Sequence, residues 1–436
     1  MLDMKWIRDH EAALQTVADQ KGMEVSIAEL VKQDEHKRRL LQEVEQLRQE
    51  RNQRSQEINR LLRAEKQAEA EEEKEKVRHL GGRLAELETR LGDAEQACHA
   101  LLLRVPNIVS PDTPVGRSDE DNVELRKAGV PVKPDFGLRD HVALGELHDM
   151  IDIPRGVKTA GSRHYYLKGA GVLLHRAVQQ LALDLLLRRG YVPLEVPTMV
   201  RTEAMTNTGF FPLGQDQTYR IGGEDRWLVG TSEVPLISYY SNEIIDVTEP
   251  VKLAAVSSCF RSEVGSAGKD VHGLYRVHQF AKVEQVILCE ASLERSEQLL
   301  QEITANAEEL LQLLELPYRV MAVCTGDMSQ KTYKQYDIET WMPSRGSYGE
   351  THSSSNVLDF QARRSGIRYR DAEGKLRYCY TLNNTAVASP RILIPLLENH
   401  QEEDGAIRIP AALRPYMNGL ERLLPSAEQP VDKQLL

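Results

Sequence analysis

Three segments of the chain gather arginines, carboxylates and hydroxyls that could handle a phosphorylated substrate. They are FRSEVGSAGKDVHGLYRVHQFAKVE (260–284), ETHSSSN (350–356) and TLNNTAVASPRILIPLLENHQ (381–401). A guanidinium is planar and always charged, so it can stabilise the negative charge that develops when a phosphate is attacked. A carboxylate beside a hydroxyl can hold Mg²⁺ together with substrate phosphates. The residue types therefore indicate phosphate chemistry.

The common nucleotide-binding loops are missing from the sequence. No GxGxxG follows an expected strand, and GxxxxGK[ST] does not occur. A nucleotide would have to bind on another kind of surface. The residues also predict no Ser/His/Asp triad, because we interpret the twelve histidines, including His272 and His278, as structural or surface residues.

The composition limits the class of protein. A chain of 436 residues is too long for one compact core and predicts two or three domains. No apolar run could span a bilayer and the N-terminus lacks secretory-signal features, so we expect a cytoplasmic protein with no membrane partner. Five widely spaced cysteines predict reduced thiols and no zinc. The net charge of -11 argues against DNA or indiscriminate nucleic-acid binding, so an RNA contact needs a local basic patch.

Residues 27–103 predict a long helical arm. The region contains no Pro and no Phe, Trp or Tyr, and apolar residues recur with the three-then-four spacing of a coiled coil. The seam residues are Leu40, Val44, Leu47, Ile58, Leu61, Val77, Leu80, Leu84, Leu87, Leu91, Ala94, Cys98 and Leu101. We expect the chain to reverse near the acidic stretch 69–75, which lacks an apolar seam residue. Two antiparallel helices of about 40 residues would extend on the order of 60 Å.

Two functions suit such an arm. A dimerisation coiled coil is the plainer interpretation, because most charged helical faces are simply solvated. Basic residues, however, crowd the first helix, and a basic helix on a projecting arm suits a phosphate backbone. The residues expected to contact RNA are Arg38, Arg48, Arg51 and Arg54. We therefore assign residues 1–104 to an RNA-binding N-terminal domain.

The rest of the chain predicts a linker and an α+β domain. Residues 105–132 are rich in Pro and poor in periodicity, which is typical of a linker. From residue 133 to 436, helical stretches alternate with short β-rich runs such as LAAVSS, KVEQVIL and YRVMAVC. This mixed order favours an antiparallel sheet flanked by helices.

The three chemical segments, together with GYVPLEVPTMV (190–200), resemble the motifs of class II aminoacyl-tRNA synthetases, and within that class the seryl enzymes. The resemblance covers essentially the whole chain, including the arm. It implies ATP-dependent activation of L-serine, then transfer to tRNA(Ser), and to tRNA(Sec) where the organism has one. It also implies a homodimer whose interface includes the segment ending at Pro197.

The resemblance assigns the ATP site. Arg261 would face the α-phosphate, Arg276 the outer phosphates, and Arg391 the γ-phosphate, so these three are the expected catalytic residues. Adenine would stack between Phe280 and a guanidinium, and Glu350 and Ser353 would be the Mg²⁺ ligands. The residues expected to bind ATP are Arg261, Ser262, Glu263, Arg276, Phe280, Glu350, Thr351, His352, Ser353 and Arg391.

The resemblance also assigns the serine pocket. Buried acceptors that pair with the serine hydroxyl would reject alanine, because they remain unpaired when the hydroxyl is missing. The residues expected to bind serine are Thr231, Ser232, Glu233, Arg261, Glu284 and Thr385. No side chain need act as a nucleophile, since the substrate carboxylate attacks ATP and catalysis is positioning plus charge stabilisation.

Four positions depart from the usual pattern of the family: Thr385, Asn384, His352 and Gly349. They bear on the shape of the serine pocket and on one outer-phosphate contact, which Arg345 could supply.

Two other functions stay open at this point. One is a ligase that loads an amino acid onto a carrier protein, and the other is a catalytically silent tRNA-binding protein. The long arm argues against the first, and the ordered set of ATP-site residues against the second.

Overall fold

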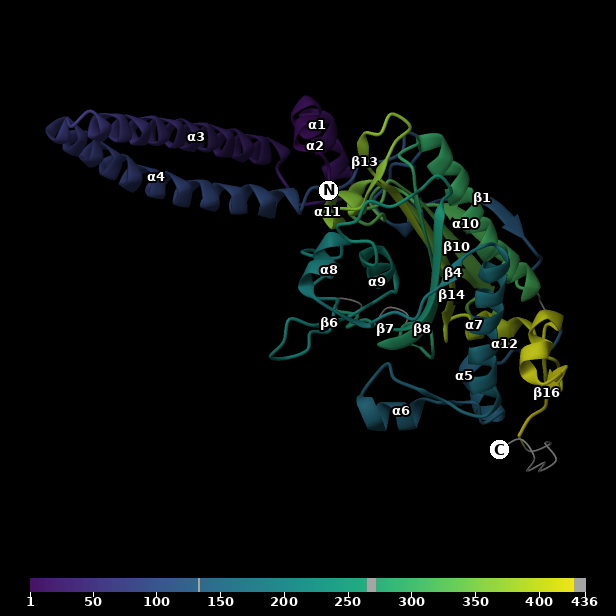
Figure 1. Ribbon diagram of the computed structural model, residues 1–436. Coiled ribbons are helices and arrows are strands. Elements are labelled where there is room, and N and C mark those ends of the chain that lie inside the picture. Colours follow the sequence, from purple (N-terminus) through teal and green to yellow (C-terminus); the bar gives the residue numbers. More distant parts are fainter. Residues whose placement is uncertain (132–133, 265–271, 427–436) are drawn as a thin grey trace. The chain divides into compact units, whose positions relative to one another are not determined.

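The computed structural model describes residues 1–131, 134–264 and 272–426 (Figure 1). The chain forms two compact units, one of residues 2–105 and one of residues 106–436 together with Met1. We describe each unit by itself.

The first unit is helical. Its elements are α1 (Met4–Asp9), α2 (Glu11–Gln20), α3 (Ile27–Arg63) and α4 (Gln67–Leu102). The Asp3 carboxylate caps α1 by accepting from the N–H groups of Lys5 and Trp6, and the Ser26 hydroxyl caps α3 by accepting from Glu29. Such side chains satisfy N–H groups that have no partner within the helix. The two long helices confirm the expected arm, and the 37 residues of α3 extend about 55 Å.

The coiled-coil seam joins α3 to α4. Its buried cluster contains Leu40, Val44 and Leu47 of α3 packed with Leu84, Leu87, Leu91 and Ala94 of α4. The reversal lies earlier than the expected 69–75, at residues 64–66, where Glu65 adopts a positive φ of 57°. The stretch 69–75 is helical instead, and Ala70 within it is fully buried. Lysines one turn away, such as Lys76 beside Glu72, compensate the acidic charges and allow a helix there.

The second unit is built on an eight-stranded sheet, confirming the α+β prediction. Its strand order is β1-β9-β10-β11-β14-β8-β7-β4. The bounds are β1 Val123–Ala128, β4 Val192–Pro193, β7 Val251–Phe260, β8 Gln279–Cys289, β9 Tyr318–Ala322, β10 Lys334–Met342, β11 Ser347–Leu358 and β14 Tyr380–Ser389. Neighbouring strands are antiparallel except β4 and β7, which are parallel.

The segment 105–132, expected to be a linker, contributes a strand to the second unit. Residues from Pro106 onward belong to the second unit, and β1 pairs with β9 at the edge of the sheet. Five of its six residues are exposed, so the strand shows no apolar alternation. It is held by ladder hydrogen bonds and by ion pairs such as Arg126 with Glu308. A charged edge strand of this kind discourages pairing with other chains.

Helices cover the sheet and complete the core. The principal ones are α7 (Ala170–Arg188), α10 (Leu293–Leu313), α12 (Leu393–Asn399) and the 3-10 helix η3 (Ala411–Met417), which share one buried apolar cluster with the strands. Among the described helices, α7 is long and apolar enough to cross a membrane by length and composition. Half of that stretch is buried in this core, as in the central helix of a soluble fold.

Smaller elements frame the sheet. They are η1 Asp119–Asp121, α5 His141–Leu147, β2 Ile151–Asp152, α6 Ile153–Ala160, β3 Tyr166–Leu167, β5 Met199–Val200, α8 Thr202–Asn207, β6 Trp227–Leu228, α9 Glu233–Ser238, η2 Pro343–Arg345, α11 Phe360–Ser365, β12 Arg368–Arg370, β13 Leu376–Tyr378, β15 Ile407–Arg408 and β16 Arg422–Leu423. Their importance for function lies in α5, α9 and η2, which contribute residues beside the site described next.

Candidate functional site

The central strands bring the three chemical segments together. In the ladder, Glu284 of β8 lies opposite Ala255 of β7 on one side and Thr385 of β14 on the other. Side chains on a strand alternate between faces, so Phe280, Lys282 and Glu284 share one face of β8. Bulges at Thr351 in β11 and at Ala386 in β14 interrupt the ladder beside this face. Bulges re-aim side chains and are common next to active sites.

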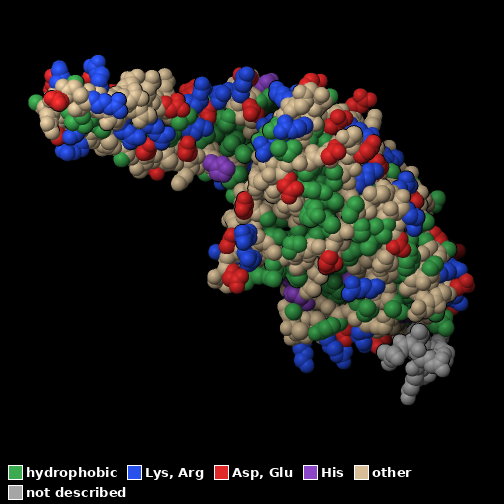
Figure 2. All heavy atoms as spheres, in the orientation of Figure 1, with side chains coloured by type: hydrophobic (Ala, Val, Ile, Leu, Met, Phe, Trp, Pro, Cys, Tyr) green, Lys and Arg blue, Asp and Glu red, His purple; other side chains and the backbone are tan. Residues whose placement is uncertain are grey.

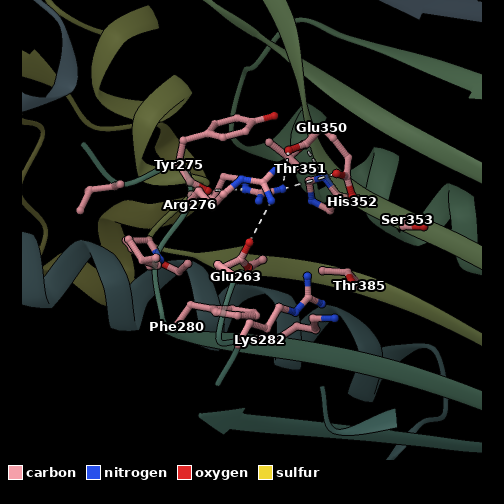
Figure 3. Close-up of a pocket in the computed structure, with 17 residues that line it drawn as sticks. Glu263, Tyr275, Arg276, Phe280, Lys282, Glu350, Thr351, His352, Ser353 and Thr385 are labelled. Carbon is pink, nitrogen blue, oxygen red and sulfur yellow. Dashed lines mark hydrogen bonds and ion pairs between the residues drawn. The ribbon is translucent and has the colours of Figure 1, made fainter. Parts of the chain in front are cut away.

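A cleft of about 530 Å³ opens over this face (Figure 3). Ten of the expected site residues line it: Arg261, Glu263, Arg276, Phe280, Glu350, Thr351, His352, Ser353, Thr385 and Arg391. Ser262 does not line it, because its hydroxyl donates to the Asp216 carbonyl at 2.6 Å. Thr231, Ser232, Glu233 and Glu284 are buried and are also absent from the wall of the cleft.

Arg261 lies directly after β7 and reaches over Phe280. Its guanidinium carbon is 5.3 Å from the centroid of the Phe280 ring, within cation-π range. Its backbone N–H donates to the His278 carbonyl at 3.0 Å, which fixes the end of the strand. The side chain is exposed towards the cleft, so a substrate could reach it.

Arg276 and Glu263 form an ion pair across the cleft, with 2.8 Å between Nη1 and Oε2 (Figure 3). Glu263 adopts a positive φ of 52°, a conformation that non-glycine residues adopt rarely. The Nε of Arg276 is buried and has no hydrogen-bond partner among the described residues. A buried guanidinium N–H without an acceptor is costly, so this donor suits an incoming anion.

Tyr275 lies within cation-π range of two arginines, and it was not among the predicted site residues. The guanidinium carbons of Arg345 and Arg391 lie 4.4 and 4.5 Å from its ring centroid. Arg391 also donates from Nε to the Tyr275 carbonyl at 3.0 Å and from Nη1 to the Glu350 carbonyl at 3.1 Å. An aromatic residue directly before Arg276 was the available signal.

Glu350 and Ser353 supply oxygen atoms at one end of the cleft, and buried Asp337 lies opposite Ser353 in the ladder. Gln335 Nε2 donates to Asp337 Oδ1 at 3.0 Å and to Ser353 Oγ at 3.2 Å. Burial, and secondly the charge of Glu350, raises the pKa of Asp337 to about 8. Asp337 was not predicted, because no motif marks it within β10.

His352 adds no charge to the cleft. Burial lowers its pKa to about 3, so the ring is neutral near pH 7. Its Nδ1 lies 2.8 Å from the Thr351 hydroxyl, which also bonds to Thr340 at 2.6 Å. The histidine therefore shapes the wall beside Ser353 rather than binding an anion by charge.

Two buried ion pairs lie at and beside the floor of the cleft, and Lys282 of the first pair lines it. Lys282 Nζ is 3.4 Å from Glu284 Oε2, the same oxygen that accepts from the Thr385 hydroxyl at 3.4 Å. Burial raises the pKa of Glu284, while the Lys282 ammonium opposes that rise. Lys331 pairs with Glu233 and lies 4.0 Å from the centroid of the Phe210 ring. Neither lysine was predicted from the sequence.

Glu233 is held by several donors. Its Oε1 accepts from Lys331, from Gln361 at 2.7 Å and from Asn383 at 3.2 Å. Its backbone N–H donates to the Thr231 hydroxyl at 3.3 Å. Ser232 Oγ is buried and has no hydrogen-bond partner among the residues described. This set forms a polar floor of fixed geometry, which suits a small polar substrate.

The arm arginines differ in their contacts. Arg48 pairs with Glu88 of α4. Arg54 pairs with Glu73 of α4 and with Glu50 of α3 itself, so both arginines link the two helices. Arg38 is exposed and Arg51 half-buried. Figure 2 shows Lys and Arg side chains along the arm, interspersed with acidic ones. The basic character of α3 is therefore partly balanced by α4.

The five cysteines are free thiols, and all are buried.

Comparison with known proteins covers both units. The family model described as the seryl-tRNA synthetase N-terminal domain matches residues 1–109, and that of the tRNA synthetase class II core domain (G, H, P, S and T) matches residues 219–400. The serine–tRNA ligase of Deinococcus radiodurans is 45% identical over 424 residues, 97% of this chain and 99% of that protein. The one from Thermomicrobium roseum is 42% identical over 426 residues, 97% and 95% of the two chains.

Solved structures agree with these relatives. The seryl-tRNA synthetase from Pyrococcus horikoshii, complexed with ATP, has a TM-score of 0.89 at 38% identity, with 98% of this chain and 100% of that one covered. The cytoplasmic serine–tRNA ligase from Naegleria fowleri, in complex with AMP, has a TM-score of 0.83 at 26% identity, with coverage of 98% and 99%. The chain therefore belongs to the seryl-tRNA synthetase family of class II aminoacyl-tRNA synthetases.

Proposed function

We propose that this enzyme activates L-serine with ATP to form seryl-adenylate and pyrophosphate, and then transfers the seryl group to tRNA(Ser). The observation that carries the proposal is the shared face of β8. Phe280 and Lys282 line the cleft, and Glu284 continues the same face into the polar floor. A nucleotide and a small amino acid bound along this face would meet beside Arg261. Family membership supports the same reaction.

Activation needs ATP and serine held in line with a cation at the α-phosphate. The serine carboxylate attacks the α-phosphorus, and the bond to the bridging oxygen of pyrophosphate breaks. Arg261 would stabilise the negative charge that develops on the α-phosphate oxygens, because a preorganised guanidinium needs no reorientation during the step. In the second step the terminal hydroxyl of the tRNA attacks the adenylate carbonyl, and AMP leaves. The protein contributes positioning and charge rather than a nucleophile.

The outer phosphates would bind between Arg276 and Arg391. The buried Nε of Arg276, which has no partner among the described residues, would gain a phosphate acceptor. Glu350 and Ser353 offer the carboxylate and hydroxyl oxygens that Mg²⁺ prefers, so the donor set fits that ion. Bound there with ATP, Mg²⁺ would neutralise phosphate charge. Adenine would stack between the Phe280 ring and a guanidinium.

Serine would bind on the floor formed by Thr231, Ser232, Glu233, Glu284 and Thr385. A carboxylate attracts the substrate ammonium, and buried hydroxyls and carboxylates pair with its side-chain hydroxyl. Alanine would leave those acceptors unpaired and be rejected. The Lys282 and Lys331 ammoniums keep the two carboxylates compensated before the substrate arrives.

The helical arm would bind the tRNA, and a substitution of the exposed Arg38 tests this contact most directly. We expect Arg38→Glu to lower kcat/KM for tRNA charging by roughly fivefold or more, because a phosphate contact becomes a repulsion. Serine-dependent pyrophosphate exchange, which needs no tRNA, should stay unchanged. Arg78→Glu on α4 is the matched control, since it makes the same charge change at a 78% exposed side chain. Equal losses in both variants would mean a general charge effect and contradict specific docking through α3.

Two enzyme copies would form the working unit. The apolar residues of α7 and β4, including Leu187 at 42% and Val192 at 55% exposure, form a surface that a partner could cover. Sedimentation velocity should then give twice the 49.3 kDa mass of the chain; a single-chain mass at micromolar concentration would refute this. Residence in the cytoplasm and use of tRNA(Sec) are further parts of the proposal.

The decisive experiment is serine-dependent exchange of labelled pyrophosphate into ATP, followed by tRNA charging. Exchange with serine, with alanine and threonine poor substitutes, is the expected result. Exchange without tRNA charging, but with transfer to a carrier protein, would point to the carrier-loading ligase instead. Absence of exchange in protein that binds tRNA would point to a silent tRNA-binding protein.

A further inference from the structure

A buried carboxylate next to the ATP cleft joins two distant segments of the chain. Glu398 near the end of α12 is 1% exposed. It accepts from the backbone N–H of His141 at 3.0 Å and from the N–H and hydroxyl of Ser344 at 3.0 and 2.9 Å. Its Oε1 also lies 2.9 Å from His141 Nδ1. Neither Glu398 nor His141 lines the cleft, so their role would be exerted through other residues.

The His141 ring transmits this hold to the segment that leads into β8. Its Nε2 lies 3.1 Å from the backbone N of Leu274. A backbone N–H can only donate, so Nε2 is the acceptor and Nδ1 carries the proton that is given to Glu398. The preceding Gly273 has a positive φ of 63°, and a Cβ there would lie 1.9 Å from His141 Nε2. The backbone therefore passes so close to the ring that no side chain fits.

Each segment held in this way continues directly into a contact of Tyr275. Leu274 precedes Tyr275 itself, and Ser344 precedes Arg345, whose guanidinium carbon lies 4.4 Å from the tyrosine ring. The helix that carries Glu398 follows Arg391, whose guanidinium carbon lies 4.5 Å from the same ring. One carboxylate thus contacts, directly or through His141, the segments that lead to the tyrosine and to Arg345, and it lies on the helix that follows Arg391.

Tyr275 needs such a hold because it has open space on two sides. It lines the ATP cleft, and it also lines a second cavity of about 380 Å³ together with His141, Ser344, Arg345 and Ile394. The ring packs against the main apolar cluster and the guanidiniums of Arg345 and Arg391, but the sides that face the two cavities have no such neighbours. Polar contacts of the residues next to it in the chain therefore help to define where it lies.

We propose that His141 and Glu398 are positioning residues for ATP: the relay Leu274 N–H to His141 to Glu398 to Ser344 fixes Tyr275, and through it Arg345 and Arg391, and so positions Tyr275 and Arg391 in the cleft. The inference rests on one part of the proposed function, namely that the cleft binds ATP. Serine binding, on the floor around Glu233 and Glu284, lies outside the relay. The relay should therefore affect ATP and serine unequally.

Isothermal titration calorimetry of the full-length protein with MgATP tests the relay without requiring catalysis. His141→Asn keeps an amide donor near the Nδ1 position but removes the acceptor of the Leu274 N–H, whereas the longer His141→Gln can place an amide oxygen near Nε2. We expect His141→Asn to raise the Kd for MgATP about tenfold, as the loss of a buried acceptor would, and His141→Gln about threefold or less. Serine KM in pyrophosphate exchange should change by less than about twofold in either variant.

His148→Gln is the control, since this histidine is also buried and bonds through Nε2 to the Gly405 carbonyl at 2.8 Å. It should leave the Kd for MgATP unchanged even if it lowers Tm. The relay would be overturned if His141→Asn bound MgATP as tightly as wild type, or if the His148 control weakened binding equally. A rise of the serine KM parallel to that of the MgATP Kd would overturn it as well. Wild type that binds MgATP but exchanges no pyrophosphate would sink the proposed function and leave the relay standing; wild type that does not bind MgATP would sink both.

Discussion

Arg261→Ala should lower kcat for serine-dependent pyrophosphate exchange by roughly 10²–10³-fold, the usual loss when one preorganised charge stabiliser is removed. The side chain lies at the end of β7, exposed to the cleft and stacked over Phe280. Its charge would act on the transition state more than on bound ATP, so KM for ATP should change far less than kcat. Steady-state exchange kinetics at saturating serine measures both.

Two further variants sharpen this result. Arg261→Lys keeps the charge but loses the planar fork, so it should recover only part of the activity. Arg370→Ala, an exposed arginine on the β12–β13 hairpin, should behave as wild type. An Arg261→Ala enzyme with wild-type kcat would remove Arg261 from the chemical step, and an equal loss in Arg370→Ala would mean that the assay reports general damage.

Lys331→Met should destabilise the second unit by about 3–5 kcal/mol, because it leaves the Glu233 carboxylate buried without its cation. The side chains of Lys331 and Glu233 are only 9% and 5% exposed. The volume of methionine is close to that of lysine, so the loss comes from charge rather than from a cavity. Differential scanning calorimetry should show the transition of this unit several degrees lower, with the helical unit melting as before.

The double variant Lys331→Met/Glu233→Gln separates the two explanations. A glutamine has no charge that would be left buried without a cation. Its oxygen can still accept from Gln361 and Asn383, which bond to Glu233 Oε1. We therefore expect most of the lost stability to return. If the double variant melts as low as the single one, shape rather than the lone charge explains the effect.

Periodicity and motif were enough to predict the arm and most of the cleft. The seam residues Leu40, Val44, Leu84 and Leu87 are buried as expected, because a helical period of about 3.5 residues leaves few other places for them. Ten of the predicted site residues line one cleft because they lie within ordered motifs on neighbouring strands. Here local sequence and tertiary structure agree.

The features that the sequence did not predict depend on partners far along the chain. Lys331 is buried because Glu233, 98 residues away, compensates it, and no local pattern marks that pairing. Strand β1 was missed because an exposed edge strand needs no apolar alternation. The arm turn was misplaced because it contains no Gly or Pro and relies on Glu65 in a left-handed conformation. The bulges at Thr351 and Ala386 likewise arise from the pairing of strands.

The register of β8 with β7 runs without a shift, and this has a consequence for how the enzyme can change. Phe280 and Glu284 are two steps apart on one strand face, a separation of roughly 13 Å set by the backbone alone. A one-residue insertion between them would turn Glu284 and every later side chain of β8 to the opposite face, and so separate the floor from the cleft. Substitutions at Glu284 or Thr385 leave that spacing intact. New amino-acid specificities should therefore be reached by exchanging side chains on a strand of constant length, while Phe280 keeps its place.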